Sequence, residues 1–219
     1  MLPLSLPKKS PRRRSILCLG AHSDDIEIGC GGSVLQLLQM YKDLEFYWVV
    51  FSSGHQRDRE ARRSAELFLK AAAKKTVVVQ DFRNGYFPSV LPDIKDYFEE
   101  LKREISPDLI FTHARHDLHQ DHRTLNQLTW NTWRDHVILE YEIPKWDGDL
   151  GTPNLYIPFD QRVAARKIKH LMACFGTQRD KHWFTPDTFQ GLMRIRGLES
   201  NSPGRFAEGF YARKVVLGS

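Results

Sequence analysis

Two short clusters of histidine and aspartate, each directly after an apolar run, are the residues of this sequence best suited to chemistry. One cluster follows residues 16–19, and the other follows residues 109–112. Together the clusters contain these side chains: His22, Asp24, Asp25, His119, Asp121 and His122. A zinc site with three protein ligands and one open position for water or substrate is catalytic rather than structural. A His-x-x-Asp turn at one strand end, joined by a histidine from a second loop, therefore predicts a zinc-dependent hydrolase.

The spacing in the first cluster separates ligands from a spare carboxylate. His22 and Asp25 project from one tight turn and are its expected ligands, and His122 completes a set of three. Asp24 then lies beside the metal without being needed to bind it. A carboxylate in that place can accept a proton from water whose pKa the metal has lowered.

The second cluster offers two further polar groups. His119 is expected to face the site as a hydrogen-bond donor or cation near the developing oxyanion. Asp121 is expected to orient an imidazole, the usual role of a carboxylate behind a metal ligand. The other histidines are expected to be ordinary surface or loop residues, namely His55, His113, His116, His136, His170 and His182.

Apolar runs alternate with amphipathic stretches through most of the chain. We expect strands at residues 16–19, 45–51, 76–79, 109–112 and 137–141. Helices are expected at residues 34–42, with Ser33 as N-cap, and at residues 57–75, 93–105 and 123–134. This order predicts an α/β fold with a doubly wound, mostly parallel sheet. Ligand sites in such sheets lie beyond the carboxyl ends of the strands, where both clusters would meet.

The last third is expected to be less regular. It offers a helix at residues 162–173 and a closing strand at residues 210–217, with a loop-rich stretch at 177–205 between them. We see no repeats and no second domain. Residues 1–14 are rich in proline and basic residues and are expected to form a flexible arm before a single domain at residues 15–219.

Composition limits the class of protein. The 219 residues, 41% of them hydrophobic, suffice for one core. A mean hydropathy of −0.47 and the lack of a long uncharged apolar stretch argue against a membrane span, and the first residues lack the order of a signal peptide, so we expect a cytoplasmic protein. The three widely spaced cysteines suggest neither disulfides nor a CxxC zinc site, and glycine neighbours favour a structural role for Cys30.

Charge identifies no partner. Much of the formal net charge of +5 comes from the arm, and we prefer a solvated arm to one that contacts nucleic acid, a membrane surface or a phosphorylated substrate. No aromatic interleaving supports nucleic-acid binding, so no nucleic acid is expected as a partner. The sequence does not indicate an oligomeric state.

The two clusters resemble the motifs of a known family. Residues 21–25 read Ala-His-Ser-Asp-Asp and are followed at residues 29–32 by Gly-Cys-Gly-Gly, which resembles the Ala-His-Pro-Asp-Asp-Glu…Gly-x-Gly-Gly motif of the LmbE-like (PIG-L) zinc-dependent deacetylases. Residues 119–122 read His-Gln-Asp-His and resemble the family's His-x-Asp-His motif. Weaker similarities follow in order at residues 52–54, 57–60, 177–178 and 207–210.

The resemblance implies a Rossmann-like fold and a reaction. It implies zinc held by His22, Asp25 and His122, Asp24 as general base, and His119 as oxyanion stabiliser or general acid. The implied reaction removes an N-acetyl group, typically from a glucosamine-type sugar, and releases acetate and a free amine.

The resemblance also reaches the rim of the site and is imperfect in the metal turn. Arg57 and Glu60 fall where the family has an element that borders the substrate. Ser23 replaces the usual proline, and Ile26 stands where the family usually has glutamate, with Glu27 one place further along. Both departures leave the three expected ligands and the expected base in place, so they bear on substrate contacts more than on catalysis.

Two alternatives stay open. A zinc amidohydrolase of the same build would act on a non-sugar amide. A non-catalytic module would hold a nucleotide in the glycine-rich turn, although this turn lacks the G-x-G-x-x-G spacing. For the deacetylase, the substrate is expected to be a small N-acetylated sugar that is free, nucleotide-linked or lipid-linked, in a site shaped by loops at residues 84–91 and 146–158.

Overall fold

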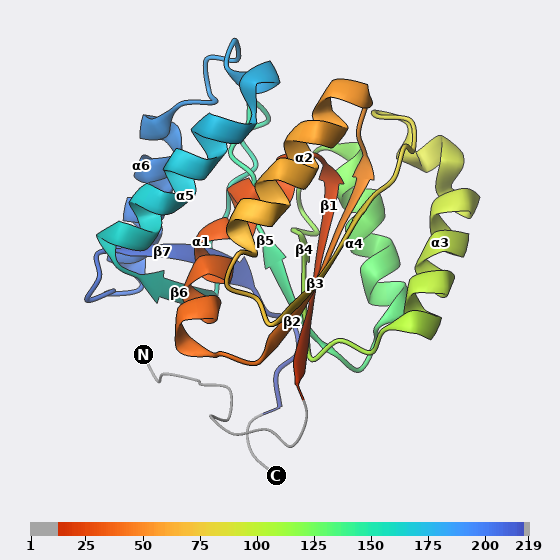
Figure 1. The fold of residues 1–219 in the computed structure, drawn as a ribbon, viewed down its shortest axis with the longest axis horizontal. Coiled ribbons are helices and arrows are strands. Elements are labelled where there is room, and N and C mark those ends of the chain that lie inside the picture. Colours follow the sequence, from red (N-terminus) through yellow and green to blue (C-terminus); the bar gives the residue numbers. More distant parts are fainter. Residues whose placement is uncertain (1–12, 217–219) are drawn as a thin grey trace.

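One seven-stranded sheet with helices on both faces organises the protein in the computed structural model, which describes residues 13–216 (Figure 1). The strands are β1 (Arg14–His22), β2 (Leu44–Ser52), β3 (Lys74–Val79), β4 (Leu109–His113), β5 (Val137–Tyr141), β6 (Leu155–Phe159) and β7 (Phe206–Tyr211). The helices are α1 (Asp25–Met40), α2 (His55–Phe68), α3 (Leu91–Glu104), α4 (Gln120–Thr132), α5 (Gln161–Cys174) and α6 (Pro186–Glu199), with 3-10 turns η1 (Phe87–Val90) and η2 (Gly176–Gln178). The expected arm falls almost wholly on residues 1–12, outside the described part.

The strand order places the ends of β1 and β4 side by side. The order is β3-β2-β1-β4-β5-β7-β6, with β1 to β5 parallel and β7 antiparallel to both of its neighbours. The order reverses at β1, because β2 lies on one side of it and β4 on the other. Ligand sites form where the order reverses. The predicted α/β fold with a mostly parallel sheet is confirmed.

Alternation along β1 divides its side chains between two cores. Ile16 and Cys18 pack into the larger core with helices α1, α2, α5 and α6. Leu17 and Leu19 pack on the opposite face with α3 and α4. Successive strand residues point to opposite faces, so a strand buried on both sides reads as the continuous apolar run seen in the sequence.

Helix α1 begins at Asp25, so the expectation of a helix from residue 34 capped by Ser33 is wrong. The glycine-rich segment lies inside this helix, where glycine is intrinsically unfavourable. Close packing explains it, because a Cβ atom at each glycine would meet an aromatic ring at 2.1 Å to 2.7 Å: Gly29 against Tyr141, Gly31 against Phe68 and Gly32 against Phe159. Tertiary packing has overridden local helix propensity.

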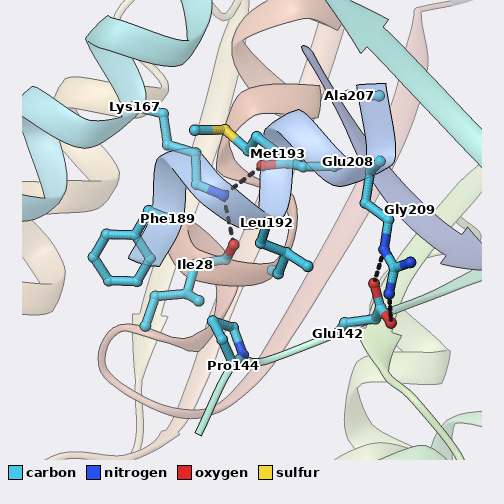
Figure 2. Close-up of a pocket in the computed structure, with 12 residues that line it drawn as sticks. Ile28, Glu142, Pro144, Lys167, Phe189, Leu192, Met193, Ala207, Glu208 and Gly209 are labelled. Atoms are coloured by element: carbon cyan, nitrogen blue, oxygen red, sulfur yellow. Dashed lines mark hydrogen bonds and ion pairs between the residues drawn. The ribbon is translucent and has the colours of Figure 1, made fainter. Parts of the chain in front are cut away.

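A buried ion pair grips the same part of α1 (Figure 2). Lys167 of α5 points between Ile28 and Glu208, and its Nζ donates to the Ile28 carbonyl at 2.5 Å and to Glu208 Oε1 at 2.6 Å. The Glu208 carboxylate also accepts hydrogen bonds from the backbone N–H groups of Gly32 and Ser33, at 2.8 Å and 2.7 Å. Glu208 thus ties β7 to the helix that begins beside the candidate site.

The C-terminal third is more regular than expected. Helix α6 crosses the stretch expected to be loop-rich, and β6 was not expected at all. The closing strand lies at Phe206–Tyr211 rather than at residues 210–217. Thr185 caps α6 by accepting a hydrogen bond from the Thr188 N–H. Position 197 in this helix requires glycine, because a Cβ atom there would lie 2.3 Å from the Arg205 carbonyl oxygen.

None of the helices in residues 13–216 is long and apolar enough to cross a membrane.

Candidate active site

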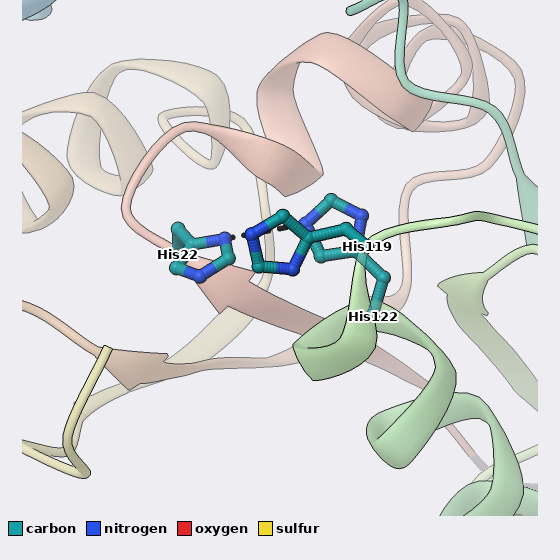
Figure 3. A group of neighbouring side chains, drawn as sticks. All are labelled: His22, His119 and His122. Atoms are coloured by element: carbon teal, nitrogen blue, oxygen red, sulfur yellow. Dashed lines mark hydrogen bonds between the residues drawn. The ribbon is translucent and has the colours of Figure 1, made fainter. Parts of the chain in front are cut away.

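The two histidine–aspartate clusters meet at the carboxyl ends of β1 and β4. His22 is the last residue of β1, Asp24 occupies the N-cap position of α1 without a side-chain capping hydrogen bond, and Asp25 is the first residue of that helix. His119 caps α4, and His122 lies in its first turn. Figure 3 shows the three imidazole rings gathered where the strand bearing His22 ends and α4 begins. Residues about 100 positions apart in the sequence are thereby brought into contact.

Three ligand-type atoms converge on one point. His22 Nδ1 lies 3.2 Å from Asp25 Oδ2 and 3.2 Å from His122 Nε2. The distance from His122 Nε2 to Asp25 Oδ2 is 3.5 Å. Nitrogen and carboxylate oxygen bind zinc at about 2.0–2.2 Å, so ligand atoms on one ion lie roughly this far apart. The His22, Asp25 and His122 side chains therefore fit a single zinc ion.

A carboxylate lies behind each of the two imidazoles. His22 Nε2 lies 3.2 Å from Asp121 Oδ2, and His122 Nδ1 lies 2.8 Å from Asp117 Oδ2. A carboxylate at one ring nitrogen keeps the proton there, so the other nitrogen presents its lone pair. Two such lone pairs and a carboxylate oxygen facing one another repel unless a cation lies between them.

Asp117 was missed by sequence reasoning. It is buried, and its Oδ1 also accepts the backbone N–H of His119. Its pKa lies well below the usual range, because contacts with His122 and nearby positive charge outweigh the effect of burial. The sequence did contain a signal for this role, because Asp117 lies five residues before the candidate ligand His122 in the same cluster.

Proton affinities at the site reflect this crowding of carboxylates. Burial lowers the pKa of His22, but Asp25 and Asp121 outweigh it and raise the pKa to about 9. Burial lowers the pKa of His122 to about 3. The charges of His122 and His22 hold the pKa of Asp25 well below its usual value, against the effect of burial. The carboxylates thus favour a positive charge at His22, whereas burial keeps His122 neutral, with a lone pair available to a metal cation.

His113 is fully buried at the end of β4, so the expectation that it is an ordinary surface or loop histidine is wrong. Its ring stacks on His122 with centroids 3.8 Å apart. Its Nε2 accepts the backbone N–H of Ala21 at 3.0 Å and lies 3.3 Å from Asp25 Oδ2. Asp25, His113 and His122 could also gather around an ion, but the hydrogen bond from Ala21 already occupies the Nε2 lone pair.

Asp24 lies next to the three converging side chains and is not one of them. It is buried, and its Oδ1 accepts a 2.6 Å hydrogen bond from Arg57 of α2. Burial raises its pKa above the usual value, and Arg57 opposes the rise. Glu27, the acidic residue displaced relative to the family motif, is fully buried, and burial raises its pKa well above the ordinary value.

His119 completes the polar edge. Its ring lies edge-on to His22 with centroids 4.9 Å apart, and burial together with the charge of His22 lowers its pKa. Its Nδ1 accepts the backbone N–H of Asp121, so in the neutral ring the proton is on Nε2. The nitrogens of His22, His119 and His122 are also close enough to one another to form a ligand group.

Glu60 contacts a loop in this structure. Its carboxylate accepts the backbone N–H of Thr177 at 3.0 Å and the Thr177 hydroxyl at 2.6 Å. Arg57 and Glu60 were both expected at the substrate rim. In the structure Arg57 contacts Asp24, and Glu60 holds the turn at η2.

The histidine–aspartate cluster at the switch point of this α/β sheet could hold a metal ion, and comparisons with known proteins identify the family. Residues 17–133 match the family model described as PIG-L, GlcNAc-PI de-N-acetylase. The chain is 30% identical over 157 residues to the uncharacterized deacetylase YaiS of Escherichia coli, a match that covers 66% of this chain and 82% of that protein. The chain belongs to the PIG-L (LmbE-like) family, a family of deacetylases.

Solved structures share the fold at low sequence identity. The N,N'-diacetylchitobiose deacetylase of Pyrococcus horikoshii superposes with a TM-score of 0.65 at 19% identity, over 91% of this chain and 83% of that one. GalB, the 4-carboxy-2-hydroxymuconate hydratase of Pseudomonas putida, superposes with a TM-score of 0.76 at 15% identity, over 94% and 98% of the two chains. A hydratase and a deacetylase on one fold show that the fold alone does not fix the reaction.

Proposed function

We propose that this protein is a zinc-dependent hydrolase that removes the N-acetyl group from a small amino-sugar substrate. Membership in a deacetylase family supports the reaction class. The single observation that carries the proposal is the convergence of His22 Nδ1, Asp25 Oδ2 and His122 Nε2, with Asp24 beside them but not among them.

His22, Asp25 and His122 would hold the metal, and Asp121 and Asp117 would orient the two imidazoles. When bound, zinc would polarise the amide carbonyl and lower the pKa of water from about 15.7 to about 7. This donor set of two nitrogens and one carboxylate oxygen is of the catalytic type, with three protein ligands.

Asp24 is the proposed general base. It would accept a proton from the attacking water, a task to which a carboxylate with a raised pKa is better matched than an ordinary one. The same proton would then pass to the amide nitrogen as the C–N bond breaks, so that acetate and the free amine leave. Arg57 holds its Oδ1, which leaves Oδ2 for this proton. His119 would donate from Nε2 to the oxyanion that forms at the carbonyl oxygen.

The proposed sugar class has one direct support, since a structural neighbour acts on N,N'-diacetylchitobiose. A non-sugar amide remains the second candidate substrate for the same chemistry. The nucleotide-binding alternative is weakened, because Gly29, Gly31 and Gly32 lie inside α1 against aromatic rings and leave no cradle for phosphate.

The test combines metal content with product release. We expect about one zinc per chain in the purified protein, and acetate release from N-acetylglucosamine or its nucleotide-linked form. Asp24→Asn should keep zinc and lose turnover by at least about a hundredfold. His122→Ala should lose zinc, whereas His136→Ala, a change directly before β5 at the amino ends of the strands, should not.

The outcomes separate the parts of the proposal. Near-normal turnover in Asp24→Asn would remove the assigned base, and full zinc content in His122→Ala would remove that ligand. Zinc without acetate release from any sugar, but with release from another amide, would favour the non-sugar substrate.

A further inference from the structure

A short segment after β5 contacts the loop that leads to the second cluster. This loop, residues 114–119, joins β4 to α4 and is called the histidine loop below. The Lys145 ammonium lies 3.1 Å from Asp117 Oδ1. The backbone N–H of Leu118 donates to Asp149 Oδ2 at 2.7 Å. Two adjacent residues of the histidine loop are thus held from one stretch of chain.

A single lysine links these two contacts. Lys145 also forms an ion pair with Asp149, so its ammonium bridges the carboxylates of Asp149 and Asp117. All three side chains are largely withdrawn from water, with exposed fractions of 10% for Lys145, 5% for Asp149 and 2% for Asp117. Buried carboxylates that share one ammonium would repel each other without it. The lysine therefore stabilises both carboxylates where they lie.

Asp117 transmits this restraint to a proposed metal ligand. Its Oδ2 lies 2.8 Å from His122 Nδ1, while Oδ1 faces Lys145 and accepts the His119 N–H at 2.8 Å. One carboxylate thus contacts the lysine through one oxygen and the proposed ligand through the other. An imidazole held at Nδ1 presents Nε2 to a metal in a defined direction.

The segment that carries Lys145 is itself held at both ends. Arg196 of α6 donates to the Glu142 carboxylate through Nε and Nη2, at 2.9 Å and 2.7 Å. Its Nη2 also donates to the Gly151 carbonyl at 2.9 Å. A bidentate contact between arginine and carboxylate fixes the geometry of both partners. The ammonium therefore reaches Asp117 from a stretch whose two ends are tied together.

We propose that Lys145 is a positioning residue of the metal site, which raises zinc affinity by holding Asp117 against His122. This inference rests on the proposed function for the metal and its ligand. Without the ammonium, Asp117 would turn away from the neighbouring carboxylate of Asp149. Its Oδ2 would then no longer hold the ring of His122, and the ligand would lose its orientation.

Zinc affinity tests the proposal independently of turnover, by titration against a competing chelator. Lys145→Met keeps an unbranched side chain and removes the charge, and it should weaken zinc binding about tenfold. Lys145→Arg should keep most of the affinity, because a guanidinium can also bridge two carboxylates. Lys95→Met is the matched control, because Lys95 pairs with Glu99 at the same four-residue spacing on α3, and its loss should leave zinc affinity unchanged.

A double variant separates positioning from a general contribution to stability. In Asp117→Ala the partner through which the lysine acts is already absent. Adding Lys145→Met to that variant should therefore weaken zinc binding no further. A lysine that only stabilised the fold would weaken zinc binding by the same factor in both backgrounds.

Two results would overturn the inference. One is wild-type zinc affinity in Lys145→Met, and the other is an undiminished loss of affinity in the double variant. Acetate release from N-acetylglucosamine and other amides is measured in parallel. Zinc binding that depends on Lys145, without acetate release from any amide, rejects the proposed reaction alone. Acetate release with zinc binding that does not depend on Lys145 rejects this inference alone, and a wild-type protein that binds no zinc rejects both.

Discussion

The side chains behind the proposed ligands matter as much as the ligands do. Asp117 and Asp121 each hold the far nitrogen of one imidazole, and each also accepts backbone N–H groups. These bonds fix which nitrogen carries the proton and where the lone pair points. A site of this kind is prepared before an ion arrives.

The first residue-scale prediction concerns Asp117. Asp117→Ala should weaken zinc binding by about 10- to 100-fold, because His122 loses the partner that orients its ring. Zinc affinity is measured by competition with a chromophoric chelator. Asp135→Ala is the control, because Asp135 makes a similar 2.8 Å contact with His136 at the surface. Unchanged zinc affinity in Asp117→Ala would contradict the role.

The second residue-scale prediction concerns pH. Asp24 can act as a base only when deprotonated, and Arg57 lowers its pKa. Arg57→Met removes that charge, so the pKa of Asp24 rises and the acidic limb of the kcat/KM profile should move to higher pH. Arg62→Met, which removes an exposed arginine paired with Asp58 on the same helix, should leave the limb in place. A limb that stays fixed in Arg57→Met would show that another group controls it.

Helix α1 joins the core to the site at the scale of the elements. Its first residue is a proposed ligand, its glycines admit three aromatic rings, and the Lys167–Glu208 pair binds its backbone. The carboxylate can reach the backbone because position 32 has no side chain. Packing of this helix therefore fixes the position of the metal turn.

The element-scale prediction is Gly32→Ala. The added methyl group would lie 2.7 Å from the Phe159 ring and 2.9 Å from Glu208 Oε1, and overpacking of this kind costs about 1–3 kcal/mol of unfolding free energy. Urea denaturation measures the loss. Gly191→Ala in α6 has open space around it and should stabilise the protein by up to about 1 kcal/mol. Equal effects of the two changes would refute the packing argument.

At the scale of the whole molecule, the sheet assembles one site from distant segments. The segments after β1 and β4 supply the proposed ligands, α2 supplies Arg57, the loop after β3 donates to Asp121, and the loop after α5 donates to Glu60. An ion that binds these segments together in the folded state stabilises the whole fold, because the unfolded chain cannot gather the same ligands.

The whole-molecule prediction is a coupled loss of metal, activity and stability. Chelation should abolish acetate release and lower Tm, and added zinc should restore both. At a free zinc concentration of 100 times Kd, the gain in stability is about 2.7 kcal/mol. The Tm of His122→Ala should not respond to zinc. A wild-type Tm that is unaffected by chelation would argue against a metal bound between these segments.

The sequence by itself determined the α/β class, a mostly parallel sheet and the two clusters at strand ends. These features are local, since they depend on apolar runs, amphipathic spacing and motif residues that are close together in the chain. The same local reasoning gave His22, Asp25 and His122 as the proposed ligands, and it expected Asp121 behind an imidazole, where the structure places it against His22.

Only the tertiary structure decided which polar residues join the site and where packing outweighs the local helix propensity of the sequence. His113 looked like a loop histidine until the sheet buried it against His122, and Asp117 acquired its importance from a contact with that ring. Helix α1 runs through its glycines because aromatic rings from other elements need the space. These outcomes depend on contacts between residues far apart in sequence, and local spacing carries no information about such contacts.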